Sequence, residues 1–184
     1  MLAVAATPDF AANRATAPSR TENEVTELFD RMRNPLLRYV SAIGLSSADG
    51  EEVIQEVFLA LFQHLRSGKP RENLRGWLFR VAHNLALKHC QKSRAYKWIE
   101  PQDDTVEGQM ALEPNPEEAL ADSQRRAGLL AVFRALSEKE RCCLSLRAEG
   151  LRYREIAEVL GISLGAVAIA LTRALERLSR ADRG

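Results

Sequence analysis

The stretch YREIAEVLGISLGAVAIALTRALERL, residues 153–178, decides the fold of the C-terminal part of the chain. Apolar residues recur at helical spacing on both sides of Gly161, which can adopt the backbone of a tight turn. Ala157 supplies the small residue that two steeply crossing helices need, Ile162 can fill the turn, and Ser163 can cap the second helix. This order predicts a helix-turn-helix, whose second helix enters the major groove of DNA, with a plain helical hairpin as the alternative. The expected buried faces are Ile156, Val159 and Leu160 on the first helix and Val167, Leu171 and Ala174 on the second.

Helical spacing continues through the rest of the 184-residue chain, and no run alternates convincingly as a strand would. Residues 25–43 predict a helix that Pro35 either kinks or restarts, and residues 53–65 predict the next. A capping box of Ser137 and Glu140 marks the start of the helix that leads into the stretch above. We therefore predict an all-α chain, whose hydrophobic content of 46% is sufficient for real cores.

Charge is unevenly distributed, although the formal net charge is only +1. Residues 71–97 contain seven basic residues and one acid, whereas residues 98–124 contain eight acids and no base. This pattern predicts a basic working surface followed by an acidic connector. We accordingly predict two small helical domains joined by a flexible acidic linker, the C-terminal one containing the helix-turn-helix. The predicted bounds are a disordered tail over 1–22, a first domain over 23–94, the linker over 95–114 and a second domain over 115–184.

The helix expected to start at Leu74 carries polar side chains along one line. These residues are four apart at every step and therefore share a face: Arg80, Asn84, Lys88 and Lys92. The predicted apolar side consists of Leu74, Trp77, Leu78, Val81 and Leu85. At this spacing Trp77 is predicted to belong to the core, and a stacking platform for a nucleic-acid base is the alternative.

The sequence gives little support for a metal site, a phosphate-binding loop or a membrane span. His89 beside Cys90, and Cys142 beside Cys143, lack the ligand spacing of a zinc site, so we expect no metal, no cofactor and thiols that are buried or idle. The sequence contains no glycine-rich phosphate loop and no run of about 18 uncharged apolar residues for a membrane span. With only three cysteines and no signal-peptide pattern, we expect a cytoplasmic protein that is not an enzyme and does not insert into membranes.

Three segments, taken in order, resemble bacterial sigma factors of the sigma-70 family, in the compact extracytoplasmic-function (ECF) class. EEVIQEVFLALFQHL (51–65) is similar to the family's polymerase-binding helix, and RGWLFRVAHNLALKH (75–89) to its promoter-melting helix. LSEKERCCLSLRAEGLRYREIAEVLGISLGAV (136–167) is similar to its second DNA-binding region. The resemblance covers roughly residues 25–94 and 115–180.

The resemblance implies a docking face for core RNA polymerase. Glu52, Gln55 and Glu56 would bind the clamp helices of the β′ subunit, and the β flap is a further expected contact. For these three side chains, an ordinary solvated helix face is the alternative. An anti-sigma factor is a further candidate partner.

The resemblance also implies a site for the −10 promoter element. Asn84 stands where the family places a base-contacting residue, and the loop 68–73 stands where it holds a flipped base. Arg80, Lys88 and Lys92 would then serve the phosphates. A base can stack or hydrogen-bond only after it leaves the duplex, so strand capture would drive melting.

The helix-turn-helix would bind the −35 element, but its reading helix departs from the family pattern. Where relatives carry a Lys or Arg, a small polar residue and an Arg, this chain has Ala168, Ile169 and Ala170. We therefore expect weaker or altered reading, with thymine methyl groups as the remaining base partners. The polar contacts expected on this side are Arg147, Arg154, Ser163, Thr172, Arg173 and Arg177.

The hypothesis from the sequence is a sigma factor that binds core polymerase and promoter DNA and directs transcription initiation. Two alternatives stay open. One is a stand-alone helix-turn-helix regulator whose N-terminal helices form a signal or dimer domain. The other is a sigma-like protein whose C-terminal domain mainly binds a protein partner.

Overall fold

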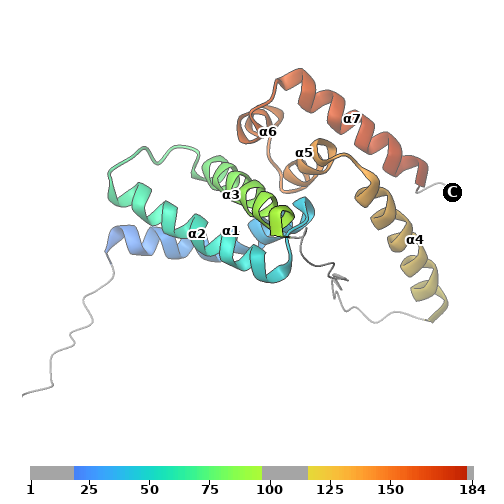
Figure 1. Ribbon diagram of the computed structural model, residues 1–184, viewed down its shortest axis with the longest axis horizontal. Coiled ribbons are helices and arrows are strands. Elements are labelled where there is room, and N and C mark those ends of the chain that lie inside the picture. The colour runs from blue at the N-terminus through green and yellow to red at the C-terminus, as the bar shows by residue number, and fades with distance from the viewer. Residues whose placement is uncertain (1–18, 97–115, 182–184) are drawn as a thin grey trace, which may run out of the picture.

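The chain is described by a computed structural model that covers residues 19–96 and 116–181. Every element in these ranges is an α-helix, which confirms the predicted all-α class (Figure 1). Most of the predicted tail and linker lies outside the described residues. The helices are α1 Arg20–Ile43, α2 Ser47–Arg66, α3 Leu74–Tyr96, α4 Pro116–Ala135, α5 Glu138–Ala148, α6 Tyr153–Leu160 and α7 Leu164–Ala181.

The first helix begins earlier than the sequence suggested. The Ser19 hydroxyl caps α1 by accepting a hydrogen bond from the backbone N–H of Glu22, and the Glu22 carboxylate in turn accepts one from the backbone N–H of Ser19. Residues 19–22 therefore belong to a helix start and not to the predicted tail. The helix then continues through Pro35 without a restart, and Gly44, with φ +109°, ends it as expected.

The stretch over residues 153–178 forms the predicted helix-turn-helix. α6 and α7 meet at 105°, an angle typical of this motif. Gly161 has φ +64°, and the hydroxyl of Ser163 caps α7 by accepting from the Ala166 N–H at 3.2 Å. The predicted inner faces are buried except at Leu160, which is half-buried. No single helix in the described ranges is long and apolar enough to cross a membrane. Among the described residues, one pair of helices, α6 with α7, has enough length and apolar content when the two are counted together, but the pair is bent by 105°.

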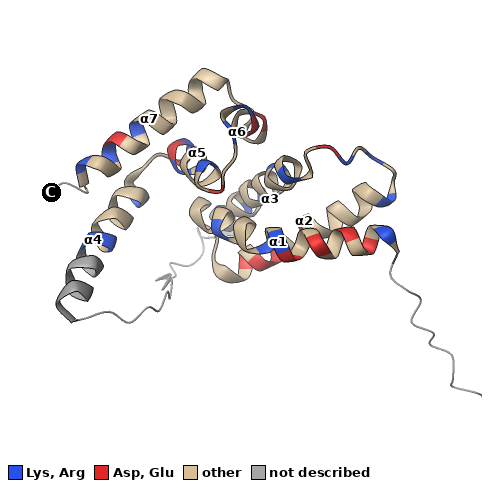
Figure 2. Cartoon of the chain, turned by 180° about the vertical axis from the view of Figure 1, so that it is seen from behind, with Lys and Arg blue, Asp and Glu red and all other residues tan. Residues whose placement is uncertain are grey.

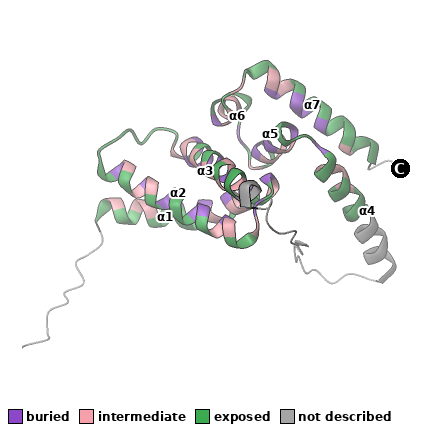
Figure 3. Cartoon of the chain, viewed as in Figure 1, coloured by how far each residue is buried: buried purple, intermediate pink, exposed green. Residues whose placement is uncertain are grey.

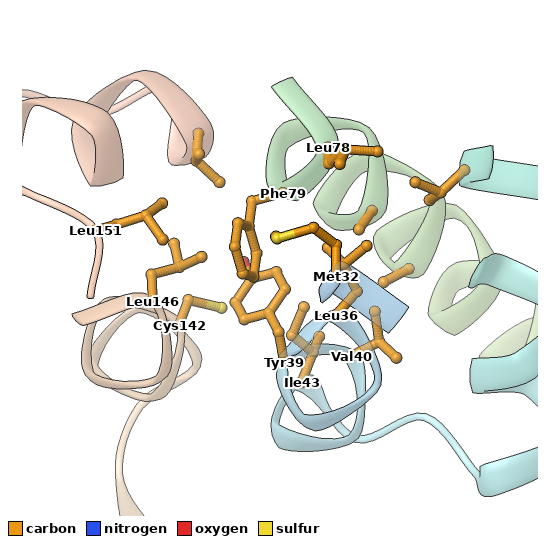
Figure 4. Packing of buried hydrophobic residues seen from close by; sticks show 14 of the residues in the cluster. Met32, Leu36, Tyr39, Val40, Ile43, Leu78, Phe79, Cys142, Leu146 and Leu151 are labelled. Atoms are coloured by element: carbon orange, nitrogen blue, oxygen red, sulfur yellow. The ribbon is translucent and has the colours of Figure 1, made fainter. Parts of the chain in front are cut away.

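The N-terminal and C-terminal helices share one hydrophobic core. α1 packs against α5, and α3 packs against α6. Figure 4 shows Tyr39 and Phe79 from the N-terminal helices pointing toward Cys142 and Leu146 of α5 and toward Leu151, which lies between α5 and α6. The two predicted helical regions are therefore packed together, an arrangement that the sequence did not indicate.

This packing widens the buried face of α3. Leu78 is buried as predicted, whereas the other members of the predicted stripe are half-buried. Phe79 and His83, which the stripe omitted, are buried because α5 and α6 cover a second side of the helix. The predicted stripe was too narrow because it considered only a core within the N-terminal region.

Candidate nucleic-acid and polymerase interface

The polar line on α3 is exposed, as the sequence predicted. Arg80, Asn84, Lys88 and Lys92 follow the helix at intervals of four residues. Within the described part of the chain, none of the three cations in this line forms an ion pair with a carboxylate. The line can therefore meet an extended anion such as a nucleic-acid strand.

The start of this line faces the first helix of the helix-turn-helix. A hollow of about 170 Å³ separates them, with Trp77 and Arg80 on one side and Glu155 and Glu158 on the other. The Glu155 carboxylate also accepts from the backbone N–H of Arg152 at 2.7 Å. Glu155 and Glu158 of α6 thus lie close to Arg80, at the start of the basic surface that a DNA strand would contact.

Trp77 packs against the core, as the sequence predicted, but is only half-buried. Its ring packs beside that of His64, with centroids 4.7 Å apart. The same residue lines the hollow next to the loop 68–73. At the end of that loop Asn73 has φ +49°, and its side-chain oxygen accepts from the Gly76 N–H at 3.1 Å. This contact fixes the loop at the start of α3.

The outer face of α2 carries an acid-amide surface. Glu52, Gln55 and Glu56 are exposed, as predicted. Leu59 continues the same face one turn later and is 58% exposed, which makes it an apolar residue that the sequence reasoning missed. Its position four residues after Gln55 could have revealed it. Figure 2 shows that acidic residues gather along α1 and α2.

His89 reaches this acidic surface from α3. Its Nε2 lies 4.0 Å from a carboxylate oxygen of Glu56, and one ligand atom each from Asp49, Glu52 and His89 lie within 4.8 Å of one another. Carboxylate and imidazole groups at this separation are of the types that ligate metal ions. The sequence reasoning compared His89 only with Cys90, so it missed these partners on another helix.

Some of the side chains predicted to bind the −35 element are exposed, and others already bond to groups within the C-terminal region. Arg154, Thr172 and Arg173 are exposed. Arg147 donates to the Leu151 carbonyl at 3.1 Å, and Arg177 lies 3.3 Å from the buried carboxylate of Glu140. Hydrogen bonds from Ser137 lower the pKa of Glu140, so this carboxylate stays charged opposite Arg177. Arg147 and Arg177 thus already have partners within the C-terminal region.

One expectation about the reading helix is wrong. Ala170 is only 4% exposed and faces the core, so it is not part of the DNA-facing surface. The position lies between the buried Val167 and Ala174 on the inner side of α7. The uncharged outer face consists instead of the exposed Gly165 and Ile169, with the half-buried Ala168 beside them.

The titratable groups at the junction of the two regions are buried. The Tyr39 hydroxyl lies 2.9 Å from Nδ1 of His83, and burial lowers the pKa of that imidazole. Burial raises the pKa of Cys142 and of Cys143 to about 11, which leaves both thiols unreactive at neutral pH. None of the three cysteines, all within the described ranges, forms a disulfide. These groups belong to the packed core between the two regions.

An exposed basic line, a separate acid-amide face and a helix-turn-helix give this helical fold the surfaces that are typical of the DNA-binding class of proteins. Comparison with known families agrees with this geometry: residues 28–96 match sigma-70 region 2, and residues 126–178 match sigma-70 region 4. The chain belongs to the sigma-70 family of sigma factors, within the ECF class.

Individual relatives of similar sequence carry the names of ECF sigma factors. The ECF RNA polymerase sigma factor SigE of Mycolicibacterium smegmatis is 29% identical over 83% of this chain and 59% of its own length. The ECF RNA polymerase sigma factor RpoE of Cereibacter sphaeroides is 25% identical over 90% of both chains. The chain spans 59% and 58% of the length of the first two curated relatives that it matches.

Solved structures share the fold. The sigma factor RpoE in complex with the anti-sigma factor NepR, from Bartonella quintana, superposes with a TM-score of 0.65 over 86% of this chain and 96% of that one, at 16% identity. CnrH in complex with the cytosolic domain of CnrY gives a TM-score of 0.57 over 86% of each chain, at 24% identity.

Proposed function

We propose that this chain is a sigma factor that binds core RNA polymerase and directs promoter-specific transcription initiation in the cytoplasm, without catalysing a reaction itself. The observation that carries the proposal is the presence of regions 2 and 4, in this order, on one chain. A stand-alone regulator would need the helix-turn-helix but not the region 2 helices. The relatives' names, which describe ECF RNA polymerase sigma factors, support the same function.

The acid-amide face of α2 is the proposed polymerase contact. Glu52, Gln55 and Glu56 are exposed there, and Leu59 adds an apolar side chain that a partner could cover. An exposed leucine flanked by acids suits the polar rim and apolar centre of a protein interface. We propose the β′ clamp helices as this partner, with the β flap contacting the C-terminal region.

Two surfaces are proposed for promoter DNA. On α3, Asn84 would read a base of the −10 element, while Arg80, Lys88 and Lys92 would bind its phosphates. On the helix-turn-helix, the exposed Arg154, Ser163, Thr172 and Arg173 would bind the −35 element. Arg147 and Arg177 would instead stabilise the domain through their partners within it.

The packed arrangement bears on how these surfaces work. Glu155 and Glu158 of α6 lie across the hollow from Arg80 and Trp77, where they would repel a phosphate backbone. The acid-amide face of α2 stays exposed in the same arrangement. We therefore propose that polymerase binds first through α2 and that the two regions separate before α3 captures a DNA strand. An anti-sigma factor, as in the complexes of the structural relatives, would act by preventing that engagement.

A binding assay with core polymerase tests the proposal. Gln55→Ala with Glu56→Ala should weaken association at least tenfold if these residues lie within the contact. The matched control is Asn23→Ala with Glu27→Ala, which removes one exposed amide and one exposed carboxylate from α1. A stand-alone regulator would show no association for any of these proteins. An equal loss of polymerase affinity in both double variants would show that the acid-amide face of α2 is not the polymerase contact.

A further inference from the structure

The outer face of the reading helix α7 has an unusual composition for a surface that meets DNA. No Lys, Arg, Asp or Glu occurs from Val159 to Thr172, and Figure 2 shows the first half of α7 without charge. Ile169 is nevertheless 55% exposed, while its neighbours Val167 and Ala170 are buried. The helix therefore presents apolar atoms on its outer side as well as on its inner side.

Helical spacing brings these positions together. Gly165, Ile169 and Thr172 are exposed and Ala168 is half-buried, and the four residues form one strip along α7. Gly165 has open space where a Cβ would stand, so the backbone itself can approach a partner closely there. Figure 3 shows the outer side of α7 as exposed, and the helix packs against α4, α5 and α6. The strip is thus accessible in the packed arrangement.

Basic and polar groups frame this strip. Arg173 follows Ile169 by four residues and lies one turn further along the same side. Arg152 and Arg154, both exposed, stand at the start of α6, and Ser163 stands at the start of α7. Cations around an uncharged centre fit a polyanion whose backbone lies on both sides of a groove. An apolar protein partner would not require this frame.

The chemistry of the strip restricts what it can read. Glycine, alanine and isoleucine side chains neither donate nor accept hydrogen bonds. In the major groove the one apolar feature on a base edge is the C5-methyl group of thymine, and the other edges offer donors or acceptors. Covering such an edge with Ile169 would leave its polar atoms without partners, which disfavours guanine and cytosine at the contacted positions.

We propose that α7 recognises its promoter element through thymine methyl groups packed against Ile169 and Ala168, with Thr172 at the edge of the strip. This inference rests on the proposed sigma function. Arg154 and Arg173 would supply phosphate contacts that are independent of sequence. The upstream element of its promoters is accordingly rich in thymine, and discrimination between bases is weaker than for a helix that places arginine on guanine.

Replacing thymine by uracil tests the proposal, because this change removes only the methyl group. Holoenzyme reconstituted from the full chain and core polymerase would first select binding sites from a duplex library randomised in the upstream element. Synthetic duplexes with uracil at single selected thymines would then be compared with the parent. Each contacted methyl should contribute about fourfold in affinity, the value expected for one buried methylene-sized group.

Two variants make the assignment specific. Ile169→Ala should lose most of the preference for thymine over uracil at the position that Ile169 contacts, and keep it at a position that Ala168 contacts. Leu130→Ala is the matched control, since it also removes an exposed aliphatic side chain, 54% exposed, but from α4 and not from the strip on α7. It should keep the fourfold preference for thymine. Thermal unfolding of both variants would verify that α7 remains folded.

Other outcomes would overturn the proposal in distinguishable ways. Initiation without any thymine preference would reject methyl reading and leave the sigma function intact. A loss of polymerase binding in Ile169→Ala, with DNA contacts unchanged, would identify the strip as a protein contact. Failure of the wild-type chain to form holoenzyme would reject the proposed function itself.

Discussion

The guanidinium of Arg38 donates to both carboxylate oxygens of Glu149, at 2.7 Å through Nε and 2.9 Å through Nη2. Arg38 belongs to α1 and Glu149 follows α5, so this bidentate pair joins the two regions of the chain. The backbone carbonyl of Glu149 also accepts a hydrogen bond from Arg75 at the start of α3. One residue of the C-terminal region is thus bound by two arginines of the N-terminal region, directly beside their common core.

Loss of this pair should favour separation of the two regions. Arg38→Ala removes a surface ion pair that contributes about 0.2–1 kcal/mol, so the separated population should rise by up to about fivefold. Energy transfer between fluorophores at Gln63 and Leu130, both exposed, would measure the population. The control is Arg31→Ala, whose side chain donates to the Glu27 carbonyl within α1 and forms no ion pair with another described residue.

The charge-swapped double variant makes that prediction stricter. Arg38→Glu alone places two carboxylates together and should separate the regions more than Arg38→Ala. Adding Glu149→Arg restores opposite charges and should recover most of the packed population. If the swap recovers nothing, the pair has no part in holding the regions together.

The shared core should dominate the stability of the packed form. Phe79 is fully buried and meets Tyr39 edge-on, with ring centroids 5.6 Å apart. Phe79→Ala should lower the free energy of unfolding by about 3–5 kcal/mol in urea titrations. Phe29→Ala removes a ring that is 37% exposed and should cost clearly less, although that ring also meets Phe58. Equal losses would contradict the burial of Phe79 at the junction.

The imidazole of His83 should make this stability depend on pH. Burial lowers its pKa in the folded chain, while the charge of Glu138 opposes that shift. The unfolded chain therefore takes up the proton first, near pH 6.5, and the free energy of unfolding falls as pH drops below that value. The fall stops once the pH is below the folded-state pKa.

His83→Gln is the matching control for the titration. Its amide can still accept from the Tyr39 hydroxyl but carries no titratable proton. Urea titrations at pH 7.5 and 5.5 should show a smaller loss for His83→Gln than for wild type. An identical loss in both proteins would assign the pH dependence to other groups.

If the basic line of α3 binds phosphates, removing its lysines should weaken the salt dependence of promoter binding. Lys88→Ala and Lys92→Ala each remove one proposed phosphate contact, so the slope of log K against log salt should decrease in magnitude by about 1. The loss should be similar for all promoter sequences. Asn84→Ala should instead weaken discrimination at one −10 position and leave the slope unchanged. Arg20→Ala, an exposed change at the start of α1, provides the baseline.

Local features of the fold could be predicted from the sequence because they depend on neighbouring residues. The capping box of Ser137 and Glu140 and the left-handed turn at Gly161 both require only a few adjacent positions. Exposure of Glu52 and of Lys88 likewise follows from helical spacing alone. These predictions agree with the structure.

Long-range contacts could not be predicted in the same way. The pair of Arg38 and Glu149 joins residues 111 positions apart, and nothing in either local pattern indicates the other partner. The same holds for Arg177, which meets Glu140 and was predicted as a DNA contact. Ala170 was misplaced because an alanine fits either side of a helix, so its burial depends on how α7 is rotated against the core.

Transcription in vitro tests the central claim most directly. Core RNA polymerase, purified free of other sigma factors, would be combined with the full chain and a duplex carrying a promoter selected by the reconstituted holoenzyme. The account predicts a run-off transcript that depends on the chain and that Gln55→Ala with Glu56→Ala strongly reduces. The absence of any transcript with a folded chain and active core polymerase would contradict it.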